Sequence, residues 1–352
     1  MGPGTRPDGP LPLRLLPFAA MAVISVVDFS AGPSVGYLPL LALGPAFASL
    51  FGGLWRTVSV GVLAIVLCTL LASYSDVLGT FRTNLTFVSI GGVTAAGMIA
   101  ATYRQRRERE LADVRDIAEA AQRVLLRPMP RRVGPVRATV RYISAAAGAR
   151  IGGDLYEVVQ TSRGVRVIVG DVQGKGLDAV ETAAVVLGAF REAAYDEEDL
   201  NGVADRIERA LSRQLTSEQF VTAVLAEVHE RDGVTLLNRG HPPPLLIRSD
   251  ASVSTLDPPE PAPPLGLAVL VDDPAPTGVV DLAPGDQMLL YTDGVIEARD
   301  SRGEFYPLTE RAGVLSADDP EDAIDGLQAD LLAYVGAPLD DDAAMLLLRR
   351  RI

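Results

Sequence analysis

The chain has 352 residues, of which 48% are hydrophobic, and it carries a formal net charge of −13. This length exceeds that of one typical domain, and the acidic balance argues against a nucleic-acid binder, because phosphate backbones reward clustered positive charge. The single cysteine rules out a disulfide framework and a cysteine metal site. The first 103 residues hold only four of the 32 basic and three of the 45 acidic residues, so the charge lies almost entirely in the remainder.

Four apolar runs near the N-terminus are each close to the length that an α-helix needs to cross a bilayer. They predict a four-helix transmembrane region within residues 1–103. Asp28 lies near the end of the first run, for which a cleaved signal peptide is the alternative interpretation. The runs are Leu15–Ala31, Val35–Leu54, Val58–Tyr74 and Leu85–Thr102.

Arginines in the connecting segments predict the orientation of these helices. Arg6 and Arg14 precede the first run, Arg56 joins the second to the third, and four arginines between 104 and 109 follow the fourth. The alternate loops hold only Arg82. Because basic residues favour the cytoplasmic side, we expect a multi-pass plasma-membrane protein whose ends and soluble domain are cytoplasmic.

Residues 104–130 predict a linker helix that ends at Pro128 and Pro130. Apolar residues recur there at steps of three and four, which indicates one apolar helical face. This helix has two interpretations. It is either a plain spacer or a signal-transmitting helix that pairs with the same helix of a second copy in a homodimer. The apolar face consists of Leu111, Val114, Ile117, Ala118, Ala121, Val124 and Leu125.

Residues 131–352 mix strands and helices in the pattern of an α+β domain. Hairpin-like strands grouped around a helical pair favour layered α and β elements over a doubly wound parallel sheet. The expected helices are Leu177–Ala194, Asp199–Leu215 and Asp318–Tyr334. The expected strands are Val136–Ala145, Asp154–Gln160, Gly164–Val172, Phe220–Glu227, Gly233–Leu237, Leu245–Arg248, Gln287–Tyr291 and Ala343–Arg350.

Aspartates at the ends of apolar strands, most of them beside glycine, are the candidate chemical groups. They are Asp154, Asp171, Asp293 and the acidic run 340–342. A strand end holds a side chain rigidly, and converging carboxylates without cysteine or histidine suit hard cations such as Mg²⁺ or Mn²⁺. A pair of such ions can activate water for attack on a phosphoryl group. Each Asp-Gly alone is also a common turn, and the glycine-rich stretch 170–176 lacks the P-loop ending and the dinucleotide spacing.

Five ordered motifs resemble those of bacterial protein phosphatase 2C-type enzymes of the stage II sporulation protein E branch, over about residues 120–350. The resemblance implies an α-β-β-α sandwich with two divalent ions, Mn²⁺ or Mg²⁺, in a cleft at one edge of the strands. The motifs are Gly152-Gly153-Asp154-Leu155-Tyr156-Glu157-Val158, Gly170-Asp171-Val172-Gln173-Gly174-Lys175-Gly176, Asn238-Arg239-Gly240-His241-Pro242-Pro243-Pro244-Leu245, Tyr291-Thr292-Asp293-Gly294-Val295-Ile296-Glu297-Ala298 and Asp341-Asp342-Ala343.

The same resemblance implies a role for each residue of the site. Asp171 matches the aspartate that bridges both metals, and the carbonyl of Val172 matches the main-chain ligand beside it. Asp293 and Asp341 match the other carboxylate ligands, and Asp154 matches the residue that holds a metal-bound water. The implied activity is that of a metal-dependent protein serine/threonine phosphatase. Family members often act on a phosphoserine of anti-sigma-factor antagonists, so a phosphorylated regulatory protein is the expected partner.

Several positions keep a second interpretation. Asp340 or Asp342 could replace Asp341 as the last ligand. Lys175, the only lysine, either contacts phosphate or spaces a turn, and His241 either acts as a general acid or holds its loop in place. The alternative function is a membrane-tethered binding module of the same fold that has lost catalysis. A small transporter is disfavoured because Asp28 is the only candidate intramembrane charge.

Overall fold

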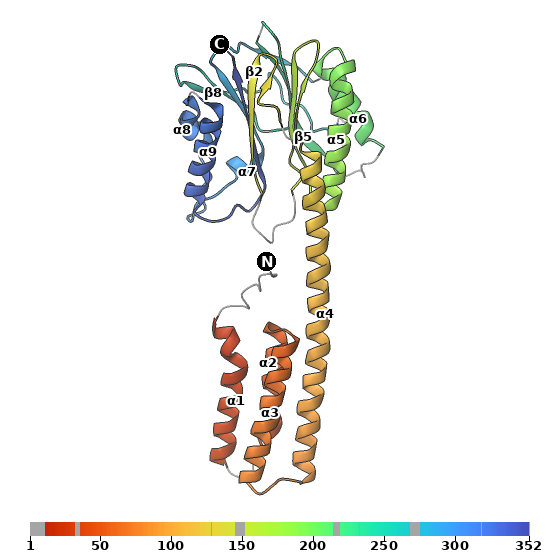
Figure 1. The fold of residues 1–352 in the computed structure, drawn as a ribbon, viewed down its shortest axis with the longest axis vertical. Helices are drawn as coiled ribbons and strands as arrows, with labels where there is room; N and C mark the ends of the chain where they lie inside the picture. Colours follow the sequence, from red (N-terminus) through yellow and green to blue (C-terminus); the bar gives the residue numbers. More distant parts are fainter. Residues whose placement is uncertain are drawn as a thin grey trace. The chain divides into compact units, whose positions relative to one another are not determined.

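The computed structural model describes residues 11–31, 36–127, 129–144, 152–213, 219–231, 233–267, 275–317 and 319–351 (Figure 1). The chain divides into two compact units, Met1–Asp113, here called unit 1, and Val114–Ile352, here called unit 2. Each unit has its own apolar core, one cluster in unit 1 and three in unit 2.

Unit 1 consists of helices. Those that follow α1 (Leu11–Ala31) are the 3₁₀-helix η1 (Leu38–Ala42), α2 (Leu43–Phe51), α3 (Leu54–Tyr74) and the first part of α4 (Phe81–Leu125). Two segments, Leu54–Tyr74 and Phe81–Glu110, are long and apolar enough to cross a membrane, whereas Leu15–Ser30 and Leu38–Phe51 are shorter apolar helices. Of the four predicted spans, two therefore correspond to candidate membrane helices in the described residues.

Helix α4 joins the predicted fourth span and the predicted linker into one helix. It runs over 45 residues from Phe81 to Leu125. No proline or glycine lies between residues 103 and 125, so nothing in the backbone chemistry interrupts the helix there. Pro128 and Pro130 follow its end, as the sequence predicts.

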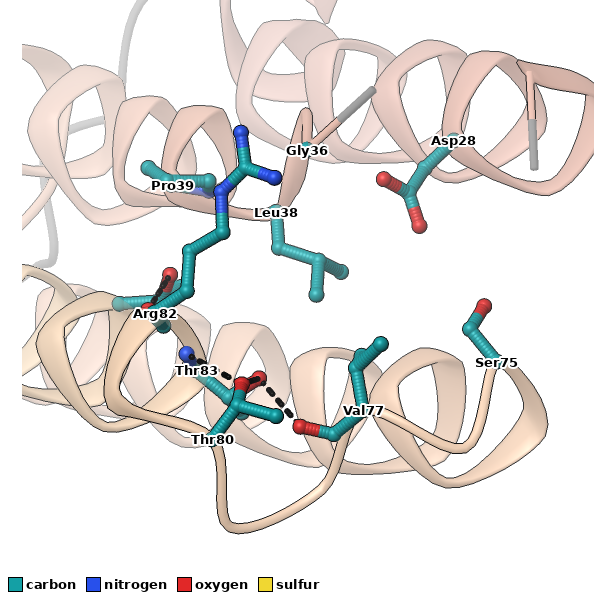
Figure 2. Close-up of a pocket in the computed structure, with 10 residues that line it drawn as sticks. Asp28, Gly36, Leu38, Pro39, Ser75, Val77, Thr80, Arg82 and Thr83 are labelled. Atoms are coloured by element: carbon teal, nitrogen blue, oxygen red, sulfur yellow. Dashed lines mark hydrogen bonds between the residues drawn. The ribbon is translucent and has the colours of Figure 1, made fainter. Parts of the chain in front are cut away.

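The helix ends of unit 1 are held by polar contacts. The guanidinium of Arg104 donates to the carbonyls of Ser49, Leu50 and Gly52 at 2.8, 2.7 and 2.7 Å. These carbonyls lie at the C-terminus of α2, where helical acceptors have no partner within the helix. At the other end of α3, residues from the end of α1, from η1 and from the α3–α4 connection enclose a cavity of about 200 Å³ (Figure 2).

Unit 2 contains two antiparallel sheets. The six-stranded sheet has the order β1-β2-β11-β10-β7-β8 and the five-stranded sheet the order β3-β4-β5-β6-β9. The first sheet is formed by Arg132–Val133, Val136–Ile143, Ala343–Arg350, Gln287–Tyr291, Leu245–Ile247 and Val253–Thr255, in that order. The second is formed by Leu155–Gln160, Val165–Val172, Val221–Val228, Val234–Arg239 and Gly278–Val280.

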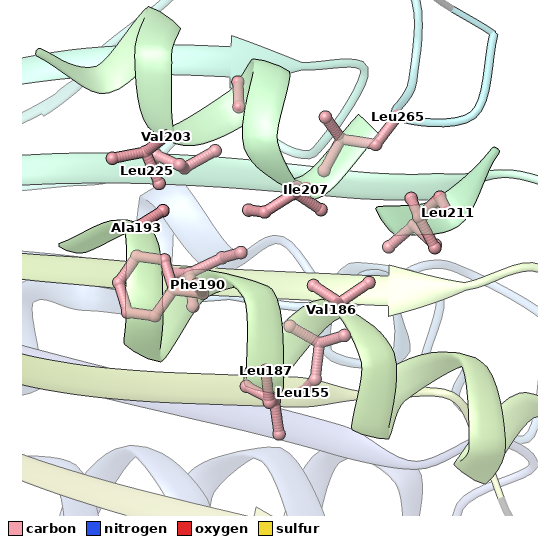
Figure 3. Packing of buried hydrophobic residues seen from close by; sticks show 14 of the residues in the cluster. Leu155, Val186, Leu187, Phe190, Ala193, Val203, Ile207, Leu211, Leu225 and Leu265 are labelled. Atoms are coloured by element: carbon pink, nitrogen blue, oxygen red, sulfur yellow. The ribbon is translucent and has the colours of Figure 1, made fainter. Parts of the chain in front are cut away.

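Helices cover the outer faces of both sheets (Figure 1). On the five-stranded sheet lie α5 (Leu177–Asp196) and α6 (Leu200–Leu211), and on the other lie α8 (Leu308–Arg311), the 3₁₀-helix η3 (Ala312–Ser316) and α9 (Pro320–Val335). Figure 3 shows Phe190 of α5 and Ile207 of α6 packed with Leu155 and Leu225 of the strands. A third apolar cluster, rich in valine, fills the space between the sheets. The predicted α-β-β-α sandwich is confirmed.

Candidate functional site

The first two predicted aspartates come together at one end of the five-stranded sheet. Asp171 is the penultimate residue of β4 and pairs in register with Thr222 of β5, while Asp154 immediately precedes β3. A Cβ added to Gly153 would lie 2.5 Å from the carbonyl oxygen of Val172. Glycine is therefore required for the two strand ends to approach, and the Val172 amide donates to the Gly153 carbonyl at 3.2 Å.

The third aspartate is contributed by the other sheet. Strand β10 ends at Tyr291, and Asp293 is the first residue of the short helix α7 (Asp293–Ile296). A Cβ on Gly294 would lie 1.9 Å from the carbonyl oxygen of Asp342, a distance that no side chain tolerates. The glycine beside Asp293 thus lets the acidic run 340–342 pack directly against this turn.

These strand ends surround a cavity of about 300 Å³. Four of the five predicted metal-site residues line it, namely Asp171, Val172, Asp293 and Asp341. Asp154, the fifth, is only 3% exposed and accepts a hydrogen bond from the Thr292 hydroxyl at 2.7 Å. The cavity wall is completed by Gly152, Gly153, Gln173, Gly174, Lys175, Phe220 and Thr222.

The acidic run turns its three side chains to different surroundings. Asp341 lines the same cavity as Asp171, whereas Asp340 lines a neighbouring cavity of about 260 Å³. Asp342 is 2% exposed, and its carboxylate accepts hydrogen bonds from the Tyr142 hydroxyl at 2.5 Å and the Gly152 amide at 2.9 Å. Of the three, Asp341 alone faces the cavity that Asp171 lines.

The carboxylates of this site raise one another's pKa, because each negative charge makes it less favourable for its neighbours to ionise. Burial, followed by the charge of Asp171, raises the pKa of Asp154 well above its ordinary value. Burial and the charges of Asp293 and Asp341 raise the pKa of Asp171 to about 7. Burial, then the charges of Glu297 and Asp341, raises the pKa of Asp293. Such a set of oxygen ligands suits a hard cation, because added positive charge relieves the repulsion.

One positive charge of the chain already lies at the cavity. The ammonium of Lys175 is 2.7 Å from a carboxylate oxygen of Asp341, and both side chains are partly exposed. Across the described ranges, no three Asp, Glu, His or Cys side chains lie close enough together to hold an ion as they stand. The oxygen donors that line the cavity fit a divalent cation in their chemistry, and Lys175 forms an ion pair with one of them, Asp341.

His241 joins the two sheets close to the site. It is 5% exposed, and its ring nitrogens lie 3.0 Å from the Thr222 hydroxyl of β5 and 3.0 Å from the Tyr291 carbonyl of β10. Because a carbonyl only accepts, the Nε2–H donates to Tyr291 and neutral Nδ1 accepts from Thr222. Burial lowers the pKa of His241 to about 4. The histidine holds its surroundings in place, as one of its two interpretations proposed.

Two sets of supporting residues escaped the sequence reasoning. Thr292 is fully buried, donates to Asp154 and accepts from the Ala344 amide at 2.9 Å, so it ties Asp154 to β11. Its position directly before Asp293 was the available signal. The second set begins in α4, where the amide of Gln122 donates to the Tyr142 hydroxyl at 2.8 Å. The Tyr142 hydroxyl in turn donates to the carboxylate of Asp342. The two residues are far apart in the sequence, so no local sequence pattern predicts this contact.

Known proteins resemble this chain in sequence and in fold. The model of the stage II sporulation protein E (SpoIIE) family matches residues 161–351. The phosphoserine phosphatase RsbU of Bacillus subtilis is 23% identical over 210 residues, which are 58% of this chain and 61% of that protein. The match thus spans less than two thirds of that relative.

Solved structures agree with the family match. The RsbU and RsbW domains of Rv1364c from Mycobacterium tuberculosis superpose with a TM-score of 0.54 at 27% identity, over 62% of this chain and 61% of that one. The SiaA-PP2C domain of Pseudomonas aeruginosa gives a TM-score of 0.58 at 20% identity, over 69% of this chain and 98% of that one. The phosphatase and regulatory fragment of SpoIIE from Bacillus subtilis gives 0.53 at 18% identity, over 61% and 64%.

Proposed function

The chain belongs to the stage II sporulation protein E family, and on that premise we propose that it is a metal-dependent protein serine/threonine phosphatase. It hydrolyses phosphoserine or phosphothreonine on a regulatory partner protein. The observation that carries the proposal is the cavity that Asp171, Asp293 and Asp341 line, at the point where ends of both sheets meet. The name of the relative RsbU, a phosphoserine phosphatase, supports the choice of substrate.

Each residue of the site has a task in this reaction. Asp171, the Val172 carbonyl, Asp293 and Asp341 would hold two divalent ions, Mn²⁺ or Mg²⁺. Bound there, the ions supply positive charge for the phosphoryl oxygens and lower the pKa of a water nucleophile. Asp154 orients that water, and its own orientation is set by the Thr292 hydroxyl. Gly153 and Gly294 let the strand ends approach closely enough for these groups to converge.

The test is manganese-dependent hydrolysis of a phosphoserine peptide by the full chain in detergent. We expect Asp171→Asn and Asp293→Asn each to lower kcat by a factor of about 10² or more, because each removes a carboxylate that would hold the metal ions. Asp322→Asn, an exposed change on α9, is the matched control and should keep wild-type activity. Equal activity in all three variants would refute the metal assignment.

A second candidate is a binding module of the same fold without catalysis. The contact that favours it is the ion pair between Lys175 and Asp341, which engages one predicted ligand. The two candidates differ in one measurement: an enzyme turns over the phosphopeptide many times, while a binding module retains it with its phosphate intact.

We also propose that unit 1 anchors the protein in the plasma membrane by four helices, with the soluble domain in the cytoplasm. Only 33% and 22% of the most apolar windows of the two long helices are buried within the unit. Aromatic side chains lie exposed near the ends of the predicted third and fourth spans, Trp55 and Tyr103 at one end and Tyr74 and Phe81 at the other, as in membrane interface belts. Membrane fractionation tests the anchor, and reporter fusions at both termini test the orientation.

The partner and the linker complete the proposal. The substrate is a phosphorylated regulatory protein of the anti-sigma-factor antagonist type, and α4 forms a homodimer that controls the site. Within unit 2, the contacts from Gln122 through Tyr142 to Asp342 give α4 a path to the acidic run. Cross-linking of the full chain, with and without residues 104–126, tests the dimer. An unchanged oligomeric state in the deletion would argue for a plain spacer.

A further inference from the structure

The cavity of unit 1 has the size of a small metabolite. It measures about 200 Å³ and is lined by residues from α1, η1, the α3–α4 connection and the start of α4. A water molecule takes about 30 Å³ in the liquid, so this volume suits an organic molecule of roughly ten heavy atoms. Apolar side chains of Leu38, Pro39 and Val77 form part of the wall. The cavity therefore suits a ligand with a small aliphatic portion.

A buried carboxylate forms one side of this cavity. Asp28 is 6% exposed, and among the described residues one of its two oxygens accepts a hydrogen bond from the Tyr37 amide at 3.2 Å. Within the described part of the chain no Lys, Arg or His forms an ion pair with it. Figure 2 shows the carboxylate directed into the cavity, with the Ser75 hydroxyl directed towards it. Burying a charge without a partner is costly, and an ionisable group in an apolar helical unit marks a functional site.

An arginine without a carboxylate partner also lines the cavity. The guanidinium of Arg82 lies against Gly36, where an added Cβ would be 2.7 Å from its central carbon. No acidic residue among those described forms an ion pair with Arg82. The guanidinium extends towards Gly36 and Pro39, while the Asp28 carboxylate is directed elsewhere in the same cavity (Figure 2). Two opposite charges thus line one small space without neutralising each other.

The connection that carries Arg82 is held in a defined shape. The Thr83 hydroxyl donates to the Val77 carbonyl at 2.9 Å and lies 3.1 Å from the Thr80 hydroxyl. The Thr86 hydroxyl donates to the Arg82 carbonyl at 3.1 Å. These threonine hydroxyls are used within the protein, so Asp28, Arg82 and the Ser75 hydroxyl are the groups that a ligand would engage.

We propose that this cavity binds a zwitterion of amino-acid size, with its ammonium on Asp28 and its carboxylate on Arg82. A lone carboxylate is too few ligands for a divalent ion, which prefers six or more oxygens. A molecule with only one charge would leave either Asp28 or Arg82 without a partner. In the topology proposed above, both contributing connections lie on the outer face of the membrane, so the ligand would enter from outside. The site does not depend on phosphatase activity.

The experiment is binding of the common free amino acids, one at a time, to the full chain in detergent, by thermal shift and calorimetry. Choline and acetate, which carry one charge each, are the comparison probes. We expect at least one amino acid to bind and to raise the unfolding temperature, and both comparison probes to bind at least tenfold more weakly. Asp28→Asn and Arg82→Gln should each weaken the amino acid's binding by roughly tenfold or more, because each removes a charge-assisted contact.

Asp76→Asn is the matched control, since Asp76 is exposed at the same connection and does not line the cavity. Its left-handed backbone, with φ of 54°, is also tolerated by asparagine. Arg82 is exposed, so Arg82→Gln keeps the fold and remains decisive even if Asp28→Asn does not fold. Absence of binding by every amino acid, equal binding of choline or acetate, or unchanged affinity in Arg82→Gln would overturn the proposal.

Discussion

The two ends of strand β4 differ in how the chain surrounds a charged side chain: one end provides partners of opposite charge, and the other provides neighbours of like charge. At one end, Arg166 is completely buried, and its guanidinium contacts Glu227 at 2.5 Å and the carbonyls of Ala194, Glu197 and Glu198 at 2.8–3.1 Å. At the other end, Asp171 lies among carboxylates that raise its pKa to about 7. The two residues are only five positions apart in one strand.

This contrast separates a structural charge from a functional one. Arg166 is satisfied by the chain itself, because it binds a carboxylate and the last carbonyls at the C-terminus of α5. Asp171 has like charges for neighbours, and its hydrogen bond with Asp154 and the charge of Lys175 offset their effect only in part. A buried group whose charge the chain does not neutralise indicates that something outside the chain does so, and that criterion selects the acidic cavity as the site.

The largest expected effect on stability comes from removing the satisfied charge. Arg166→Met leaves Glu227 buried without its guanidinium partner and removes a donor from three carbonyls, so we expect the free energy of unfolding to fall by about 3–5 kcal/mol. Arg163→Met, an exposed change on the same hairpin, should change it by about 0.5 kcal/mol or less. Denaturant titration measures both. A loss in Arg166→Met no larger than that in Arg163→Met would contradict the assignment.

His241 should make the free energy of unfolding depend on pH in the acidic range. Folding lowers the pKa of His241 from 6.5 to about 4. Between these two pH values His241 is protonated in the unfolded chain and neutral in the folded protein. Stability should therefore rise as the pH increases from about 4 to 6.5, by about 3 kcal/mol from this group. The carboxylates titrate nearby, so the quantity to measure is the difference between wild type and His241→Gln across that range. A slope unchanged in His241→Gln would show that another group is responsible.

Regular strands with strong patterns were predictable, and short or irregular elements were not. Strands β10 and β11 are found at the predicted residues, since each is a continuous apolar run buried on both faces. The three-residue strands β8 and β9 are absent from the sequence prediction, because partly exposed segments of that length carry no readable alternation. The second predicted span was read as one helix, whereas η1 and α2 divide it and Gly52 and Gly53 end it.

For the site, the aspartates could be predicted from the sequence, but the residues that hydrogen-bond to them could not. Asp171 and Asp293 could be found because strand ends and adjacent glycines leave a local pattern. The pairing of Tyr142 with Asp342 could not, because the two residues are 200 positions apart and meet only when β2 pairs with β11. The sequence of the acidic run 340–342 does not by itself show which of its three aspartates faces the cavity.

A moderate effect is expected where α4 meets the acidic run. Tyr142→Phe keeps the ring but removes the hydroxyl that donates to buried Asp342, so we expect a loss of about 1.5–3 kcal/mol. Gln122→Leu should cost less, about 1 kcal/mol, because its partners, the Tyr142 hydroxyl and the Gly152 carbonyl, are uncharged. Denaturant titration of both single variants and of the double variant measures the coupling. Strict additivity would show that α4 does not act on Asp342 through Tyr142.

The smallest effect concerns the lysine that already neutralises part of the acidic cavity. Lys175 and Asp341 are partly exposed, so their ion pair is worth at most about 1 kcal/mol. If Lys175 competes with a metal ion for Asp341, Lys175→Met should strengthen Mn²⁺ binding up to about fivefold in calorimetry. Arg299→Met, which removes a cation from the neighbouring cavity, should leave Mn²⁺ affinity unchanged. A lysine that instead contacts the phosphate would give unaltered Mn²⁺ affinity and a higher KM for the phosphopeptide, because its charge would then act on the substrate and not on Asp341.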